Sequence, residues 1–277
     1  MIGICTDSNS QLPPALAERY GIEVVPLTVV VDDREYLEGV TLDADEFYAM
    51  YTPGHCPAVS TSLPSPGQFA AAYDDLLARG CTEILSIHVS AAVSGTLNAA
   101  RLAAHSLPAP VRLVDSGTAS FGISCCVWAA AAAIAEGATL DQAATVAEQL
   151  SPHIGNVFVV GALDHLRRSG RVGDPAHAAG LPVLTLKDGA VDVVAVAETM
   201  LDAINAMANF AVGWGDHVRV AIGHSDAATE PLAEGLQEAV GEAASVVEVV
   251  RYRVGPSVGV HTGPGTVGCF VFPAAVS

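Results

Sequence analysis

The clearest shortage in this sequence is of basic residues. Lysine and arginine together number 12, against 30 aspartates and glutamates, and the formal net charge is −18. A surface of this charge repels a phosphate backbone, so nucleic acid is not expected as a partner. The same charge opposes docking on an anionic membrane. An anionic ligand therefore needs a local site that outweighs the field of the whole chain.

Cysteine lacks the spacing of a metal site or of a disulfide framework. The six cysteines form no CxxC, and two of them, Cys125 and Cys126, are adjacent in an apolar stretch. We expect free buried thiols in a reducing cytoplasm. The N-terminus shows no basic segment followed by a cleavage-like site, so no signal peptide is expected and the predicted location is cytoplasmic.

One uncharged run, residues 116–135, is long enough to cross a bilayer. It consists mainly of Ala, Ser, Gly and Cys, which favour lipid weakly. We therefore predict a buried helix there and no stable membrane insertion.

Several catalytic signatures are missing. The sequence contains no GxSxG, no GxxxxGK[ST] and no HExxH, so no nucleophile elbow, phosphate loop or zinc motif is predicted. Gly263, Gly265 and Gly268 fit GxGxxG, but only nine residues follow, too few for the helix and strand that a dinucleotide fold requires. Asp7 stands alone at a strand end, where capping a turn is favoured over binding a metal. No metal and no cofactor are expected.

With 51% hydrophobic and 15% charged residues, the chain is too apolar for disorder. In the first 150 residues strands and helices alternate, which is typical of a parallel α/β sheet. We predict strands at 2–5, 23–31, 84–89 and 111–114, and helices at 12–20, 43–51, 67–79, 97–106, 116–136 and 140–150. The first and last of these strands both end in Asp-Ser, at residues 7–8 and 115–116.

Strand–turn–strand patterns follow residue 155 and indicate a mixed sheet. We place a domain boundary there and expect domains at 1–155 and 156–277. The strands predicted in the second domain are 156–160, 182–186, 191–197, 218–223, 245–252 and 269–272, with helices at 163–169, 201–213 and 230–243.

The most informative segment runs from Ser90 to Thr96, between a predicted strand and a predicted helix. A helix start exposes backbone N–H groups and partial positive charge. Ser94 and Thr96 add hydroxyl donors, and Gly95 permits close approach of a ligand. The segment favours a phosphate or carboxylate site. A simple helix cap explains the same residues.

A second hydroxyl cluster, Ser60-Thr61-Ser62, precedes a Pro-rich segment in what we interpret as a loop, residues 57–66. Ligands of parallel sheets gather beyond the carboxyl ends of the strands. If this loop lies there, Thr61 and Ser94 converge on one anion. An ordinary helix-entry loop is the alternative.

The only basic cluster lies around Arg167, Arg168 and Arg171. It either binds an acidic group or partner, or forms a helix C-terminus capped by Gly170. His261 lies in a Gly-rich, polar stretch that we interpret as flexible. It either hydrogen-bonds an anion or has a structural role.

Taken together and in this order, these segments resemble the DegV family of bacterial fatty-acid-binding proteins. The resemblance covers nearly the whole chain and rests on seven short matches: Thr6-Asp7-Ser8, Val25-Pro26-Leu27, Thr61-Ser62-Leu63-Pro64-Ser65, Ser94-Gly95-Thr96, Val114-Asp115-Ser116, Ser169-Gly170-Arg171-Val172 and His261-Thr262-Gly263.

The resemblance implies an N-terminal three-layer α/β/α domain with a parallel sheet and a C-terminal two-layer domain with a mixed sheet that covers an acyl tunnel. It implies a long-chain fatty acid as the ligand. The binding residues would be Thr61, Ser62, Ser94, Gly95, Thr96 and His261. It also implies an ATP-binding kinase subunit as a partner, which meets Arg171 and Arg168 and converts the fatty acid to acyl-phosphate.

The sequence departs from the family pattern at three places. The usual Ser-Ser-Gly is Ser90-Ala91-Ala92, the usual Gln of the Thr-Ser-Gln-Pro loop is Leu63, and the usual Gly-Gly-Arg is Ser169-Gly170-Arg171. The head-group side chains remain, while Leu63 changes the pocket entrance or its shape.

Three functions are consistent with these features. The first is a non-catalytic protein that holds one fatty acid and presents its carboxylate to the kinase. The second is a stand-alone enzyme that acts on a small phosphorylated or carboxylated substrate at the Ser94 turn, with His261 as base. The third is a regulatory interaction protein with an empty cleft. The first is preferred because no motif pairs a nucleophile with a base.

Overall fold

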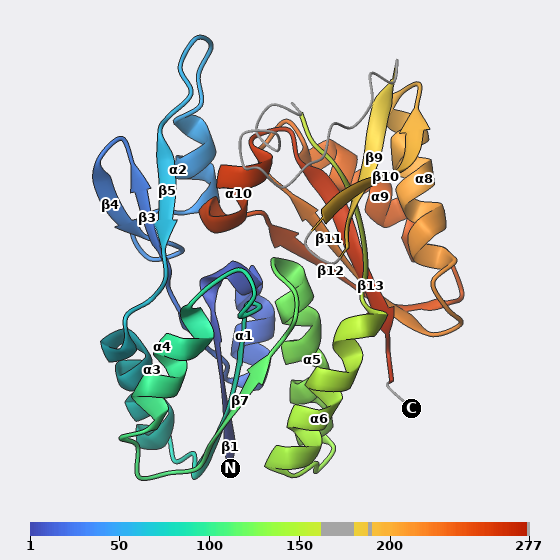
Figure 1. Cartoon of the computed structure of the whole chain (residues 1–277). Coiled ribbons are helices and arrows are strands. Elements are labelled where there is room, and N and C mark those ends of the chain that lie inside the picture. The colour runs from blue at the N-terminus through green and yellow to red at the C-terminus, as the bar shows by residue number, and fades with distance from the viewer. Residues whose placement is uncertain (162–179, 188–189, 276–277) are drawn as a thin grey trace. The chain divides into compact units, whose positions relative to one another are not determined.

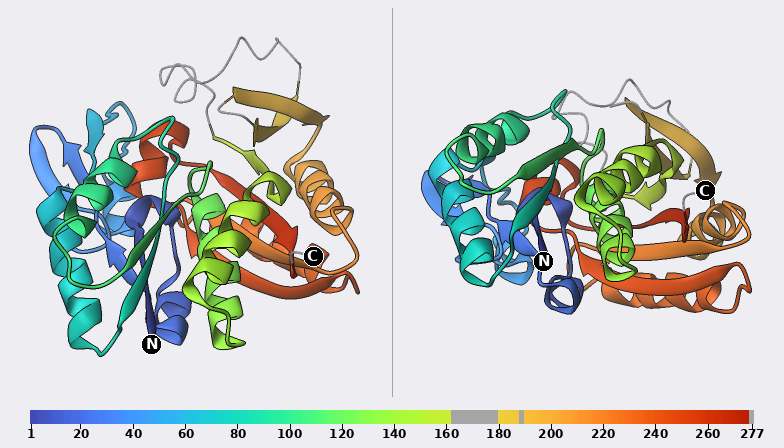
Figure 2. Two further views of the ribbon diagram at one scale, coloured as in Figure 1. Left: turned by 60° about the horizontal axis from the view of Figure 1, so that its bottom comes forward. Right: turned by 90° about the horizontal axis from the view of Figure 1, so that it is seen from below.

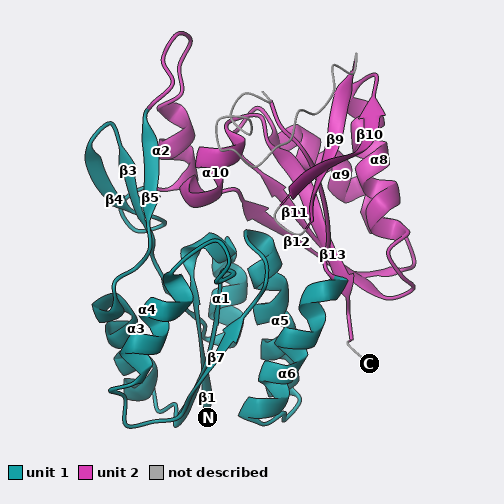
Figure 3. Cartoon of the chain, in the orientation of Figure 1, with its two compact units in different colours: residues 1–42, 58–153, 276–277 teal, residues 43–57, 154–275 magenta. Residues whose placement is uncertain are grey.

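The computed structural model describes residues 1–161, 180–187 and 190–275. Contacts within the chain divide it into two compact units (Figure 3). The first unit comprises residues 1–42 and 58–153, and the second comprises residues 43–57 and 154–275. Compactness does not test independent folding, so the domain division at residue 155 stays a prediction. Residues 43–57, expected in the first domain, pack with the second unit.

A parallel sheet forms the centre of the first unit (Figure 1). Its strand order is β2-β1-β6-β7, and neighbouring strands pair in parallel. The strands are β1 (Ile2–Asp7), β2 (Glu23–Val25), β6 (Glu83–His88) and β7 (Val111–Asp115). β1 and β6 are almost entirely buried, as expected of parallel strands covered on both faces.

Helices cover both faces of this sheet (Figure 2). One layer holds α3 (Pro66–Ala78) and α4 (Thr96–Ala104), which pack with the sheet in one apolar cluster. The other layer holds α5 (Phe121–Ala135) and α6 (Leu140–Leu150), which contact each other, and α5 contacts β1 and β6. The expected three-layer α/β/α arrangement is therefore confirmed.

The apolar run predicted as a buried helix is α5. Residues 121–131 are all buried, so the helix needs no polar face. Across the described ranges of the chain, the model contains no helix that is both long and apolar enough to cross a bilayer.

Two short elements connect β1 to β2: the 3-10 helix η1 (Ser8–Ser10) and the helix α1 (Pro14–Tyr20). A second 3-10 turn, η2 (Ser151–His153), ends the first unit. Pro14 occupies the first helical position of α1, where its missing N–H costs nothing.

A small antiparallel sheet, in the order β4-β3-β5, accompanies the parallel one. Its strands are β3 (Thr28–Val31), β4 (Arg34–Leu37) and β5 (Val59–Ser62). The prediction of a loop over 57–66 was therefore wrong in part, because β5 pairs with β3 and places Thr61 opposite Val29. Pro26 lies between β2 and β3 and divides the strand predicted at 23–31 into two.

The second unit is built on a mixed sheet in the order β10-β9-β8-β13-β11-β12. Among the described strands of this mixed sheet, only β11 and β12 pair in parallel. Helices α8 (Met200–Val212) and α9 (Glu230–Gly241) share one apolar cluster with the sheet, which confirms the mixed α/β class. The strands are β8 (Gly155–Val159), β9 (Leu181–Lys187), β10 (Ala190–Ala197), β11 (Val218–His224), β12 (Val246–Arg253) and β13 (Val267–Pro273).

Two short helices complete the second unit: α2 (Ala44–Ala49) and α10 (Pro256–Thr262). A capping box opens α2, since Asp43 and Glu46 exchange side-chain to backbone hydrogen bonds. The stretch around His261, predicted to be flexible, contains α10 instead. The helix predicted at 163–169 lies outside the described residues.

Candidate functional site

The parallel sheet has a topological switch between β1 and β6. From β1 the chain moves to β2 on one side and later returns to β6 on the other side. At such a point the connections leave in opposite directions, and the carboxyl ends of the two strands face an open edge where ligands bind. Asp7 ends β1 and His88 ends β6, so both stand at this edge.

The segment singled out by sequence, Ser90 to Thr96, follows β6 and therefore begins at the switch. The backbone N–H groups of Val93 and Ser94 both donate to the Ser90 carbonyl, which folds the segment into a turn. Gly95 is the N-cap of α4 and makes no side-chain cap bond. The helix-cap interpretation thus applies to Gly95. The hydroxyls of Ser94 and Thr96, on either side of it, bond to each other.

The hydroxyls of Ser94 and Thr96 form a hydrogen-bonded pair. Their oxygens lie 2.8 Å apart, and the Thr96 N–H donates to Ser94 Oγ at 3.3 Å. Thr96 is fully buried, whereas Ser94 is half-buried. When Thr96 donates its proton to Ser94, the Ser94 hydroxyl directs its own proton outward. The turn can then offer a hydroxyl donor to an anion without a neighbouring cation.

The second hydroxyl segment lies next to this turn. A Cβ built on Gly95 would stand 3.1 Å from Leu63 Cδ2, so the backbone of the turn touches the residue that follows Thr61 and Ser62. Thr61, Ser62 and Leu63 are exposed. The structure therefore brings the end of β5 and the Ser94 turn together within one unit, and the shared use of Thr61 and Ser94 by one anion stays a prediction.

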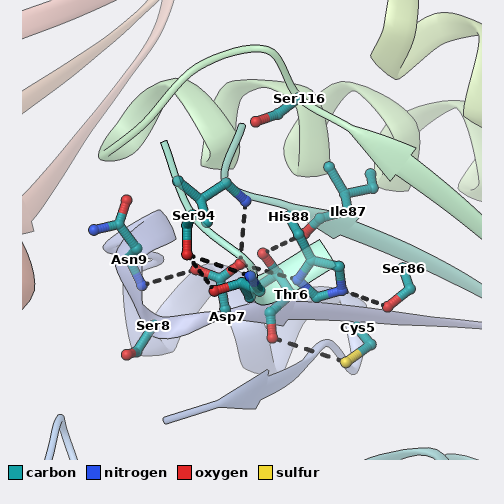
Figure 4. A network of polar contacts seen from close by, with 12 residues as sticks. Cys5, Thr6, Asp7, Ser8, Asn9, Ser86, Ile87, His88, Ser94 and Ser116 are labelled. Atoms are coloured by element: carbon teal, nitrogen blue, oxygen red, sulfur yellow. Dashed lines mark hydrogen bonds and ion pairs between the residues drawn. The ribbon is translucent and has the colours of Figure 1, made fainter. Parts of the chain in front are cut away.

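Beneath the turn lies a buried chain of polar side chains (Figure 4). His88 Nδ1 is 2.9 Å from Asp7 Oδ2, and His88 Nε2 is 2.6 Å from Ser86 Oγ. Ser86 Oγ is in turn 2.9 Å from the Tyr73 hydroxyl. Burial raises the pKa of Tyr73, which therefore keeps its proton as a donor. All four side chains are fully buried, so each polar group must find its partner inside the protein.

The direction of this hydrogen-bond chain follows from Asp7. Asp7 Oδ2 also accepts the Val89 N–H at 3.2 Å, and Oδ1 accepts the Asn9 N–H at 3.1 Å. The carboxylate only accepts, so His88 donates from Nδ1. The other ring nitrogen, Nε2, lies beside Ser86 Oγ, which also lies beside the Tyr73 hydroxyl.

The order Ser86–His88–Asp7 is that of a nucleophile, a base and an orienting acid. The exposed fraction of each of these side chains is 0%. A substrate carbonyl cannot reach Ser86, so the arrangement does not form a hydrolytic site. Both ring nitrogens of His88 have partners, which are Asp7 and Ser86. The Ser94 hydroxyl bonds to Thr96 and not to His88.

His261 belongs to the second unit. It lies in the last turn of α10 and is half-buried. The following turn is rigid: Gly265 N–H donates to Asp226 Oδ2 at 2.6 Å, and Thr266 Oγ1 donates to the Gly263 carbonyl at 2.9 Å. His261 therefore stands at a defined helix end, which corrects the interpretation of this stretch as flexible.

Arg168 and Arg171 lie outside the described residues.

Of the six cysteines, Cys56 is exposed, which corrects the expectation that all are buried, and the other five are buried. Burial raises the pKa of the Cys5, Cys125, Cys126 and Cys269 thiols, so they stay protonated and unreactive.

Two other features of the described residues bear on where a ligand could bind: their metal-binding side chains and a surface depression. The described residues contain no cluster of three His, Cys, Asp or Glu side chains that could hold a metal ion. A shallow depression lined by Glu83, Val111 and Asp141 lies at the amino ends of β6 and β7. That is the opposite end of the strands from Ser94.

Sequence reasoning missed the Asp7–His88 pair. The two residues are 81 positions apart, and His88 was not singled out. A usable signal was present, since each ends a strand of a predicted parallel sheet. Adjacent strands of such a sheet bring their carboxyl ends to one edge.

A family model with the description "Uncharacterised protein, DegV family" matches residues 1–274. A DegV domain-containing protein from Streptomyces coelicolor is 36% identical over 279 residues, with 98% of each chain covered.

Solved structures show the same similarity. A DegV family protein from Thermus thermophilus, described as binding fatty acid, aligns with a TM-score of 0.85 and 31% identity, over 98% of this chain and 99% of the other. DegV from Bacillus subtilis, described as a fatty acid binding protein, aligns with a TM-score of 0.82 and 25% identity, over 98% of each chain.

Proposed function

The chain belongs to the DegV family, and from this premise we propose that it binds one long-chain fatty acid through the Ser94 turn. The observation that carries the proposal is the hydroxyl pair of Ser94 and Thr96 at the switch of the parallel sheet. The similarity to fatty-acid-binding structures from Thermus thermophilus and Bacillus subtilis supports the ligand class.

The energetics of such a ligand divide between its two ends. Burying one methylene contributes about 0.8 kcal/mol, so a long acyl chain supplies on the order of 10 kcal/mol before association costs. A hydrogen bond to the carboxylate contributes about 1.5–3 kcal/mol. The tail therefore sets the affinity, and the hydroxyls of Ser94 and Thr61 set the orientation of the head group. Ser62, Gly95, Thr96 and His261 complete the proposed head-group set.

We further propose that the protein is non-catalytic and acts in the cytoplasm. It presents the carboxylate to a separate ATP-binding kinase subunit, which forms the acyl-phosphate. The absence of a phosphate-loop motif in the sequence agrees with catalysis by a partner. Arg168 and Arg171 are the proposed contacts with that subunit, because basic side chains are scarce elsewhere in the chain.

The ligand is tested by native mass spectrometry of the purified protein, followed by solvent extraction. The expected result is a mass excess equal to one acyl chain, identified as a fatty acid. A protein that is purified without lipid and stays so after incubation with a panel of fatty acids would contradict the proposal. In that case phosphorylated small molecules become the candidates for the Ser94 turn.

The site is tested by the Ser94→Ala and Thr61→Ala variants. Each removes one hydrogen bond to a charged group, so we expect the dissociation constant for oleate to rise about tenfold. Ser106→Ala is the matched control, because Ser106 is an exposed hydroxyl just beyond the far end of α4. Unchanged affinity in the Ser94/Thr61 double variant would exclude these head-group assignments.

The partner is tested with the kinase subunit, ATP and hydroxylamine as a trap for acyl-phosphate. Arg171→Ala is expected to lower the yield of acyl hydroxamate while oleate binding stays unchanged. Hydroxamate formed by this protein and ATP alone would show that the chain is itself the enzyme.

A further inference from the structure

The Asp-Ser pairs that end β1 and β7 flank the strand that carries the head-group turn. The sheet order is β1-β6-β7, so Asp7 and Asp115 stand on opposite sides of the carboxyl end of β6. The Asp-Ser repetition is visible in the sequence, and the proposed function gives it no role.

Three consecutive backbone N–H groups follow β6, and the strand-end acids Asp7 and Asp115 accept the first and the third of them. Val89 N–H donates to Asp7 Oδ2 at 3.2 Å. Ser90 N–H donates to the Thr118 carbonyl at 2.9 Å. Ala91 N–H lies between both Asp115 oxygens, at 3.2 and 3.3 Å.

Further backbone hydrogen bonds connect these residues to Ser94. The Ser90 carbonyl accepts the N–H groups of Val93 and Ser94, each at 3.1 Å. Fixing Ser90 therefore fixes the backbone of Ser94, whose hydroxyl is bonded to Thr96. Asp115 Oδ1 also accepts the Gly117 N–H at 2.9 Å, which anchors the acid itself.

The two acids are held differently. Asp7 is fully buried and bonded to His88, whereas Asp115 is exposed. Both carry negative charge close to a turn that is proposed to bind an anion. Electrostatics alone therefore disfavours both acids at this place, and their hydrogen bonds to the backbone of the turn point to a role that outweighs repulsion.

We infer that Asp7 and Asp115 are positioning residues for head-group recognition. They hold the backbone of residues 89–91 so that the Ser94 hydroxyl faces the carboxylate. The inference rests on the proposed function, because it assumes that a fatty-acid head group binds at this turn. His88 takes part by fixing the orientation of the Asp7 carboxylate from below.

The experiment compares oleate with oleyl alcohol, which shares the tail and lacks the carboxylate. In the full-length Asp115→Ala variant we expect the dissociation constant of oleate to rise about tenfold. The dissociation constant of oleyl alcohol should change less than twofold. Asp115→Asn keeps one acceptor oxygen and should restore part of the acid-to-alcohol preference.

The sign of the effect separates positioning from charge. If Asp115 acted only as a charge, its removal would tighten oleate binding, because a repulsive neighbour is gone. Tighter or unchanged oleate binding in Asp115→Ala overturns the inference. Asp202→Ala is the matched control, since this exposed acid accepts the Thr199 N–H in the second unit and should leave the preference unchanged.

The buried acid provides an independent test. Asp7→Asn is expected to lower the acid-to-alcohol preference in the same direction as Asp115→Ala. If Asp7→Asn fails to fold, the exposed Asp115 decides the inference alone. A wild-type protein that binds neither oleate nor oleyl alcohol refutes the proposed function. If the wild type prefers oleate and the variants prefer it to the same degree, only the positioning role is refuted.

Discussion

Two buried histidines, His88 and His224, each end a strand. An acid lies beside the first and an arginine beside the second. His88 ends β6 and lies 2.9 Å from the Asp7 carboxylate. His224 ends β11, and its Nδ1 lies 3.3 Å from an Arg251 guanidinium nitrogen. Burial, and after it the charges of Arg253 and Arg251, lower the pKa of His224 to about 4; Glu230 and Asp226 oppose this shift. His224 is therefore neutral near pH 7 and accepts a hydrogen bond from Arg251.

This lowered pKa predicts a pH-dependent stability. The ordinary pKa of 6.5 applies in the unfolded chain, so between pH 6.5 and about 4 the unfolded state binds more protons. The contribution of His224 is complete above pH 6.5 and is lost as the pH falls through this window. Between pH 7.5 and pH 5 the loss is about 2 kcal/mol.

The measurement is urea unfolding of the wild type and of His224→Asn at a series of pH values. Asparagine keeps an acceptor near the position of Nδ1 and does not titrate. The wild type should lose about 2 kcal/mol more than the variant between pH 7.5 and pH 5. Parallel curves would contradict the assignment. His217→Asn controls for a general effect of histidine removal, because His217 is exposed and lies just before β11.

At the scale of single residues, the sequence was sufficient to identify site residues whose neighbours in the chain form a recognisable motif. Ser94, Gly95 and Thr96 are small and polar between a strand and a helix, and the structure places them at a helix start. His88 carries no local pattern, because its significance comes from Asp7 across the neighbouring strand. Side chains whose partners lie in distant strands become visible only when the sheet order is known.

At the scale of elements, the helices that the sequence predicted have local stop and start signals. Capping boxes open α2 at Asp43, α3 at Ser65, α6 at Thr139 and α8 at Thr199. Helix α10 was missed because its seven residues include Gly259 and two glycines flank it. Strands β4 and β5 were missed because they are short and exposed, so neither shows an apolar alternation.

Gly259 predicts how α10 is held. A Cβ on this residue would lie 2.5 Å from the Tyr48 hydroxyl and 2.8 Å from Phe47 Cε1, both on α2. Gly259→Ala therefore forces α10 and α2 apart. We expect a loss of about 1–3 kcal/mol in the free energy of unfolding, measured by urea denaturation.

The control for this prediction is another helical glycine. Gly241 ends α9, and a Cβ there meets nothing within 4 Å. Gly241→Ala should be neutral or stabilise the protein by up to about 1 kcal/mol, because alanine loses less backbone entropy. Equal effects of the two substitutions would show that α10 does not pack on α2 as described. If His261 takes part in head-group binding, Gly259→Ala also weakens oleate binding.

At the scale of the whole molecule, the alternation of strands and helices was sufficient to predict the fold class. The parallel pairing of β1, β6 and β7 follows from helices between the strands, and the antiparallel pairing of β9 and β10 follows from a short turn. The packing of residues 43–57 with the second unit was not predictable. Their capping box specifies a helix and carries no information about its long-range partners.

The net charge of −18 makes a last prediction, on the rate at which the ligand arrives. An acidic surface repels a fatty-acid anion at distances within the Debye length, which falls from about 30 Å at 10 mM salt to about 10 Å at 100 mM. The association rate of oleate should therefore rise severalfold over this range. The dissociation rate should change little, since short-range contacts at the head group and tail set it. Stopped-flow displacement of a fluorescent fatty acid measures both rates.

Oleyl alcohol separates charge from the general effect of salt on apolar ligands. It has the same tail and no charge, so its association rate should be nearly constant between 10 and 100 mM salt. A rise for oleate alone shows that the acidic surface opposes entry and that a short-range site overcomes it. If salt instead slows the association of oleate, a local basic field dominates the approach, and the arginines around Arg171 become its expected source.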